Sequence, residues 1–207
     1  MKKYEIGLYE KAMRNTLTWK EKLQCAKECG YDYLEISIDA TEEKINRIYM
    51  DTEEKREIME AIFDTGIPIG SMSVSALTKY ALGDPDQAVR DRGMEIAEKS
   101  IQLSSALGVR TVMIPGYDIY YGESTIETKR YFLENIRKIA EIAEREGILV
   151  GFETMENNFM NTTGKAVQYV NMVDSAYLKI YPDAGNITNA AVANRHDVCE
   201  DLSLGKG

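Results

Sequence analysis

Two acidic side chains in the second half of the chain have the spacing of a paired site. Glu153 and Asp183 each stand at the end of a short apolar run, residues 148–152 and 177–181. They are about 30 residues apart, the length of one strand–helix–strand repeat. Parallel strands joined in this way place their carboxyl ends at one edge of the sheet, where active sites of parallel α/β proteins lie. The pair therefore predicts half of a divalent-metal site or an acid/base pair. The alternative is that each acid only caps the helix after its strand.

The elements that would position this pair alternate between strands and helices. Apolar runs predict strands at residues 4–9, 33–38, 67–74, 109–114, 148–152 and 177–181. Capping residues predict helix starts at Thr18 with Glu21, Asp51 with Glu54, Asp84 with Pro85, Ser124 with Glu127, and Asn161 or Thr162. Gly30, Gly66, Gly108 and Gly147 are placed to end helices. One last helix is expected near residues 190–202.

Strands that alternate with helices indicate a parallel sheet with right-handed crossovers. The choice is between a doubly wound sheet and a (β/α)8 barrel. No G-x-G-x-x-G sequence follows the first strand, which weakens the dinucleotide-binding form. Polar residues end most strands, as expected for a barrel. We therefore predict an α/β fold of the (β/α)8 TIM-barrel type, in which residues 1–207 form a single incomplete domain with about six of the repeats.

The composition restricts the class of protein. The chain has 207 residues, of which 44% are hydrophobic and 29% charged, as expected for one soluble domain. No apolar run approaches the roughly 20 residues that span a bilayer, and the first residues turn acidic before a signal-peptide core could form. A cytoplasmic protein with no membrane partner is therefore expected. The net charge of −9 argues against nucleic acid, but not against a small anionic substrate held by a few cations or a metal.

Cysteine and histidine residues add little to the prediction. Cys25 and Cys29 lie four residues apart on a predicted helix, and buried thiols are the expectation; a metal pair is the alternative, although no further ligand lies nearby in the sequence. His196 is the only histidine and is expected on a surface helix, with a role as a substitute ligand as the alternative. Glu35 interrupts the apolar second strand, and we expect it to face either the mouth of the barrel or a buried partner.

Four short motifs resemble a known family. They are LYEKA at 8–12, PGYDIYY at 115–121, MNT at 160–162 and YPDAGN at 181–186. Together they resemble the L-ribulose/L-xylulose-5-phosphate 3-epimerase family of the xylose isomerase-like barrel superfamily, from residue 4 to about residue 189. The resemblance implies a sugar-phosphate substrate and a divalent metal ion (Mn, Zn or Mg). In that family the metal is held by Glu, Asp, His and Glu at the ends of strands five to eight. Glu153 matches the first of these ligands and Asp183 the second.

The resemblance also assigns substrate contacts, with some departures. The family's loop after the third strand usually reads S-x-H-R-R/K-F/Y, whereas here residues 75–80 read SALTKY, which leaves Lys79 as the retained contact. Tyr117 and Tyr120 are predicted to bind substrate in a loop that shields the site from water, with a packed surface loop as the alternative. Asn186 is predicted to contact substrate or to orient Asp183. The family's His and last Glu have no counterpart, because the chain ends where the seventh strand is expected.

The chemistry implied by the resemblance is proton transfer at C3 of the ketose. Loss of that proton gives an enediolate, whose charge the metal would stabilise. Glu153 would serve as one acid/base, and its partner would be the absent eighth-strand glutamate. We therefore expect the chain to bind metal weakly and to turn over slowly or not at all. The alternatives are a related ketose isomerase, or an inactive shortened homologue that binds a ligand or a partner subunit. The open first and sixth strands would also favour a homo-oligomer.

Overall fold

The structure is a computed structural model that describes residues 4–205, and its centre is one parallel sheet of six strands in the order β1-β2-β3-β4-β5-β6. The strands are β1 Gly7–Tyr9, β2 Tyr33–Ser37, β3 Ile69–Ser73, β4 Thr111–Pro115, β5 Leu149–Glu153 and β6 Leu178–Tyr181. Each strand pairs with the next one along the chain. A doubly wound sheet would reverse its strand order, so this order confirms the barrel type. Within residues 4–205, β1 and β6 are the two edges of the sheet.

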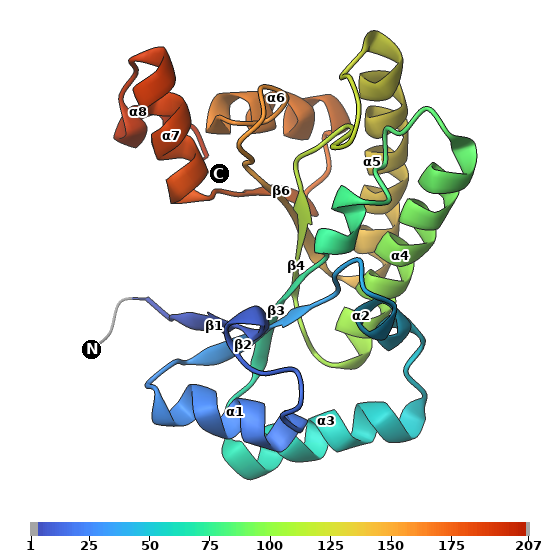
Figure 1. Cartoon of the computed structure of the whole chain (residues 1–207), viewed down its shortest axis with the longest axis vertical. Helices are drawn as coiled ribbons and strands as arrows, with labels where there is room; N and C mark the ends of the chain where they lie inside the picture. The colour runs from blue at the N-terminus through green and yellow to red at the C-terminus, as the bar shows by residue number, and fades with distance from the viewer. Residues whose placement is uncertain (1–3, 206–207) are drawn as a thin grey trace.

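The helices surround the sheet in an arc that Figure 1 shows from α1 and α3, through α4 and α5, to α6. Their bounds are α1 Trp19–Glu28, α2 Glu42–Asn46, α3 Thr52–Thr65, α4 Gln87–Ala106, α5 Ile126–Glu146, α6 Thr163–Val173, α7 Ala184–Asn194 and α8 Val198–Ser203. Short 3-10 turns occupy Glu10–Ala12, Arg47–Tyr49 and Ser75–Thr78. The core lies between the strands and these helices, where Phe132 of α5 packs on Phe152 of β5 with ring centroids 5.7 Å apart. No described helix combines the length and the apolar content needed to cross a bilayer.

Local capping explains why several helices begin where predicted. Thr18 and Glu21 form the expected capping box at α1, and Asp51 and Glu54 form the one at α3. Thr162, rather than Asn161, caps α6. Gly66 and Gly147 end their helices in the left-handed conformation, with φ of 72° and 66°. In a box, each side chain accepts a backbone N–H that the helix itself cannot pair.

Two predicted helix starts are wrong by one or two residues. Asp84 does not cap α4; it accepts a hydrogen bond from the Asp86 N–H at 2.8 Å, and Asp86 caps the helix instead. Ser124 does not cap α5, because its hydroxyl donates to Asp118 at 2.7 Å and Thr125 takes the cap position. In both cases a tight turn before the helix uses the first polar side chain.

The C-terminal region also differs from the prediction. A single helix was expected near residues 190–202, but the chain forms α7 and α8. The break lies at Arg195, which takes the left-handed conformation with φ of 56°, and Asp197 then caps α8. His196 lies in this turn and is exposed, so it is not on a helix surface as expected. The short helix α2, capped by Thr41, was not predicted.

We expect Asp51→Ala to lower the free energy of unfolding by about 1 kcal/mol, because the first turn of α3 loses the acceptor for two backbone N–H groups. Urea unfolding monitored by circular dichroism measures this difference. Glu57→Ala, at an exposed position of the same helix, is the matched control and should change stability by less than about 0.5 kcal/mol. Equal stabilities for the two variants would show that the box does not stabilise α3.

Candidate active site

Glu153 and Asp183 lie close to each other at the carboxyl edge of the sheet. Glu153 ends β5 and pairs with Tyr181 of β6, two residues before Asp183. Glu153 is half-buried, and burial raises its pKa to about 7; the negative charges of Asp183, Glu35 and Glu156 act in the same direction. The strand–helix–strand spacing thus brings the two predicted acids together, as the sequence indicated. A carboxyl group with this pKa can accept and return protons near neutral pH.

The two acids differ in their hydrogen bonds. Asp183 caps α7, because its Oδ1 accepts the Asn186 N–H at 2.6 Å. The simpler interpretation, that the acid caps the next helix, is therefore correct for Asp183. Glu153 caps no helix, since Thr162 caps α6, and its carboxylate accepts no hydrogen bond from any residue between 4 and 205. Glu153 is thus the group left free for chemistry.

Thr154 ties the two strand ends together. The Asp183 N–H donates to Thr154 Oγ1 at 2.9 Å, and the Asn186 side-chain amide donates to the Thr154 carbonyl at 3.0 Å. Asn186 therefore orients Asp183 through its backbone and locks the neighbouring strand through its side chain, while its predicted contact with substrate stays a prediction. Thr154 was missed in the sequence, where only its place directly after Glu153 could have indicated its role.

A polar bridge between non-neighbouring strands lies close to these acids, since the Glu35 charge acts on Glu153. Glu35 Oε2 accepts hydrogen bonds from the Ser71 hydroxyl at 2.6 Å and from the Tyr181 hydroxyl at 3.0 Å. The bridge joins β6 to β2, which are far apart in the sheet order. Burial raises the pKa of Tyr181 above its usual value, and the Glu35 charge raises it further. Of the two expectations for Glu35, the structure shows the buried partner.

The aromatic loop after β4 lies next to the acids. Tyr117 is buried and its hydroxyl donates to Glu156, a residue that the sequence analysis did not single out. The Tyr120 ring packs edge-on against Tyr117 at 4.8 Å, and Tyr121 packs against Tyr120 at 4.7 Å. Burial, followed by the bond to Glu156, raises the pKa of Tyr117, so its hydroxyl stays protonated as a donor. These contacts suit the predicted shielding role, whereas contact with substrate stays a prediction.

Lys79 stands apart from this group. It follows the 3-10 turn after β3, is exposed, and its Nζ lies 5.1 Å from the centre of the Tyr80 ring. No hydrogen bond or ion pair in the described part of the chain links it to Glu153 or Asp183. Because it follows the carboxyl end of β3, Lys79 lies at the same end of the sheet as the acids. Its predicted contact with substrate is supported only by the resemblance.

The donor set fits a divalent cation in kind but supplies only part of a site. Carboxylate oxygens such as those of Glu153 and Asp183 are suitable ligands for a hard divalent ion. Catalytic metal sites commonly use about three protein ligands. Within residues 4–205, no three His, Cys, Asp or Glu side chains converge to hold a metal ion.

The expected thiol burial is wrong for Cys29, which is exposed, and Cys25 is only partly buried.

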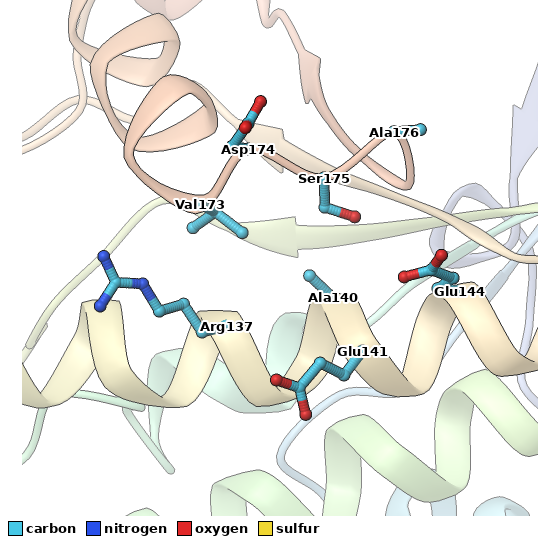
Figure 2. Close-up of a pocket in the computed structure, with 8 residues that line it drawn as sticks. All are labelled: Arg137, Ala140, Glu141, Glu144, Val173, Asp174, Ser175 and Ala176. Carbon is cyan, nitrogen blue, oxygen red and sulfur yellow. The ribbon is translucent and has the colours of Figure 1, made fainter.

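A pocket of about 300 Å³ lies away from the acids, between α5 and the turn that precedes β6. Figure 2 shows Arg137, Glu141 and Glu144 on one helix and Asp174 and Ser175 on the facing turn, and all five residues line this pocket. This turn lies at the amino end of β6, and in barrels this end contributes to stability rather than catalysis. We therefore place the candidate active site at the carboxyl edge.

Comparisons with known proteins identify the family of the chain. A family model described as xylose isomerase-like TIM barrel matches residues 23–203. L-ribulose-5-phosphate 3-epimerase UlaE of Escherichia coli O157:H7 is 36% identical over 206 residues, which span 100% of this chain and 71% of that protein. UlaE of Escherichia fergusonii is 35% identical over 206 residues, which again span 100% of this chain and 71% of that protein.

Solved structures show the same fold at lower identity. An L-ribulose 3-epimerase superposes with a TM-score of 0.75 at 20% identity, covering 98% of this chain and 67% of that one. A D-psicose 3-epimerase with D-fructose gives a TM-score of 0.76 at 20% identity, covering 90% of this chain and 65% of that one. At this identity the superpositions establish a shared fold only.

Proposed function

The chain belongs to the xylose isomerase-like TIM barrel family, and from that premise we propose that it interconverts L-xylulose 5-phosphate and L-ribulose 5-phosphate by proton transfer at C3. The observation that carries the proposal is the proximity of Glu153 and Asp183 at the carboxyl edge, in a chain that is 36% identical to a curated L-ribulose-5-phosphate 3-epimerase. Half-burial and the absence of hydrogen bonds from residues 4–205 leave the Glu153 carboxylate able to act on a substrate.

The proposed reaction begins when Glu153 takes the proton from C3, next to the C2 ketone. Without a bound ion, the pKa of Glu153 is about 7, which suits a base that works near neutral pH. The buried Tyr117 and the loop that carries it limit access of water to the enediolate. Glu153 and Asp183 would hold a divalent ion, which supplies Lewis-acid stabilisation of the developing charge when bound. The resemblance assigns return of the proton on the other face to a glutamate of an eighth strand, which residues 4–205 do not contain.

A non-catalytic function is the second candidate, and it is favoured by the partial ligand set. Two carboxylates alone would hold a metal weakly, and a protein of this kind could bind a sugar phosphate without turnover. The two candidates differ in one product assay. After incubation of L-xylulose 5-phosphate with the chain and Mn²⁺, ¹³C NMR should show L-ribulose 5-phosphate. An aldose phosphate would indicate a ketose isomerase, and unchanged substrate would favour the binding protein.

We expect Asp183→Asn to weaken Mn²⁺ binding at least about tenfold from a parent Kd on the order of 1 mM. Asparagine can still cap α7, so the loss would report the missing carboxylate charge rather than a damaged helix. Electron paramagnetic resonance of free Mn²⁺ measures the affinity. Asp197→Asn makes the same change at the N-cap of α8 and is the matched control, which should leave the Mn²⁺ affinity unaltered. Equal Mn²⁺ affinity for Asp183→Asn and the parent would remove Asp183 from the metal site.

A further inference from the structure

The loop that joins β4 to α5, residues 116–125, contains no regular secondary structure and contacts the candidate active site. Its first residue is bonded to the acid, because the Gly116 N–H donates to the Glu153 carbonyl oxygen at 3.0 Å. Tyr117 follows, and its hydroxyl donates to Glu156 in the loop after β5. Residues 116–125 are therefore linked both to Glu153 and to the loop that begins after it.

Asp118 is the buried charged residue of this loop, with no exposed surface. Its Oδ2 accepts hydrogen bonds from the Ser124 hydroxyl at 2.7 Å and from the Thr128 hydroxyl at 2.6 Å. Ser124 lies near the end of the same loop, and Thr128 lies in the first turn of α5. One carboxylate oxygen thus ties the beginning of the loop to its end and to the helix that follows.

The backbone of Asp118 is held by a second segment of the chain. The Gly83 N–H, in the turn before α4, donates to the Asp118 carbonyl oxygen at 2.9 Å. A Cβ atom on Gly83 would lie 2.5 Å from this oxygen and 2.4 Å from the Thr128 carbonyl oxygen. Only glycine allows this approach without a shift of the backbone. Asp118 is therefore fixed between the turn before α4 and the start of α5.

A carboxylate is an expensive group to bury at this position. Burial of a charge is costly unless a cation or several donors compensate it. No Lys, Arg or His side chain of residues 4–205 forms an ion pair with Asp118, and its Oδ1 is buried without a hydrogen-bond partner in this part of the chain. What the charge contributes is strength in the two bonds at Oδ2, because hydrogen bonds to an ionised acceptor are roughly twice as strong as neutral ones.

We infer that Asp118 is a positioning residue for the proposed reaction, an inference that rests on the proposed epimerase function. Its carboxylate holds residues 116–125 in one conformation, which keeps the Tyr117 ring against Tyr120 and the Gly116 N–H on Glu153. Asp118 touches no reacting atom and acts through these groups. A misplacement of about 1 Å at a reacting group can lower the rate by on the order of 10²-fold.

The test compares Asp118→Ala with Asp118→Asn and Asp201→Ala. The first variant loses both hydroxyl bonds, so kcat/KM for C3 exchange of L-xylulose 5-phosphate should fall by about tenfold or more. The asparagine carbonyl can accept the same two bonds, and Asp118→Asn should stay within about threefold of the parent. Asp201 is also buried, but it accepts its two bonds from the backbone of α6. Asp201→Ala should therefore stay within about twofold of the parent.

These variants separate positioning from stability. Circular dichroism gives the folded fraction of each variant, and kcat/KM is expressed per folded protein. Equal losses in Asp118→Ala and Asp201→Ala would overturn the inference, because any buried carboxylate would then have the same effect. A loss in Asp118→Asn as large as that in Asp118→Ala would also overturn it, because the two hydroxyl bonds would then not be what matters.

A readout that needs no turnover separates this inference from the proposed function. Amide hydrogen exchange of the full chain, followed by mass spectrometry, should be at least about tenfold faster for residues 116–125 in Asp118→Ala than in the parent. It should be unchanged there in Asp118→Asn and Asp201→Ala. Unchanged protection of the loop in Asp118→Ala would overturn the inference. If the parent catalyses no C3 exchange, the epimerase function fails, while amide exchange still decides whether Asp118 holds the loop.

Discussion

Replacing Glu10 by glutamine is expected to lower the free energy of unfolding by about 3–5 kcal/mol, because it removes the carboxylate that three buried or partly buried cations share. The Glu10 side chain is fully buried and accepts bonds from Lys22 Nζ and Lys44 Nζ, both at 2.6 Å. It also accepts two bonds from Arg47, at 2.6 and 2.9 Å. The Ser37 N–H donates to it at 2.9 Å. Glutamine would leave three partly or fully buried positive charges without a counter-ion.

The surroundings of the cluster make this cost larger than for a surface ion pair. Lys22 and Lys44 are almost fully buried, and the Trp19 ring lies 4.8 Å from both the Lys22 Nζ and the Arg47 guanidinium carbon. Urea unfolding of Glu10→Gln measures the loss. Glu134→Gln removes a carboxylate from the exposed pair with Arg130 and is the matched control, with an expected change below about 1 kcal/mol. A Glu10→Gln effect as small as that of the control would contradict the role assigned to the cluster.

The same cluster predicts how stability depends on pH. Burial alone would raise the pKa of Glu10, but the bonds and charge of Arg47 and the bonds from Lys22 and Lys44 hold it well below its usual value. A carboxyl group whose pKa is lowered by folding stabilises the protein at pH values above its unfolded-state pKa, which is about 4.3. This stabilisation is lost as the pH falls below that value. The stability difference between the parent and Glu10→Gln should therefore be constant from about pH 5 to 7 and shrink below about pH 4. Urea titrations at several pH values would show this, and a difference that grows on acidification would contradict it.

Glu153→Gln is expected to lower kcat/KM for L-xylulose 5-phosphate by about 10²–10⁴-fold, the usual contribution of a positioned acid/base. Glutamine keeps the size of the side chain but cannot take the C3 proton. Because the folded-state pKa of Glu153 is raised, the charged form is disfavoured by folding, and the variant should be at least as stable as the parent above pH 7. An activity loss without a stability loss would separate a chemical role from a structural one.

Glu144→Gln provides the matched control for this variant. Glu144 lies at the pocket near the amino end of β6, and its substitution makes the same change of charge far from the reaction. Its kcat/KM should stay within about twofold of the parent value, since nothing there contacts the substrate. Equal activity losses in the two variants would show that net charge, rather than Glu153 itself, controls the rate.

Local signals in the sequence predicted much of the fold. Asp51 and Glu54 lie three residues apart, and a capping box needs only that spacing. The choice between Asp84 and Asp86 at α4 was missed because both suit a cap, and the turn through Pro85 decides between them. The αL break at Arg195 was also missed, because no glycine marks it. Single residues therefore shift the boundaries, while the period of the strands sets the architecture.

Part of the candidate site could be predicted from the sequence, and part could not. The proximity of Glu153 and Asp183 follows from one repeat length and could be predicted. The Tyr181–Glu35 bridge joins residues that are distant in sequence, so it depends on the curvature of the whole sheet. The Glu10 cluster likewise gathers side chains from separate helices and turns. Such contacts are set by tertiary packing, which no local pattern in the sequence contains.

The most direct test of the central claim, that Glu153 moves the C3 proton, is deuterium exchange at C3 of L-xylulose 5-phosphate in D₂O. The 207-residue chain is assayed with and without Mn²⁺, beside Glu153→Gln and Glu144→Gln. The proposed function predicts slow exchange that requires the metal, disappears in Glu153→Gln and persists in Glu144→Gln. Exchange that survives in Glu153→Gln, or no exchange by a folded parent that binds the sugar phosphate, would contradict it.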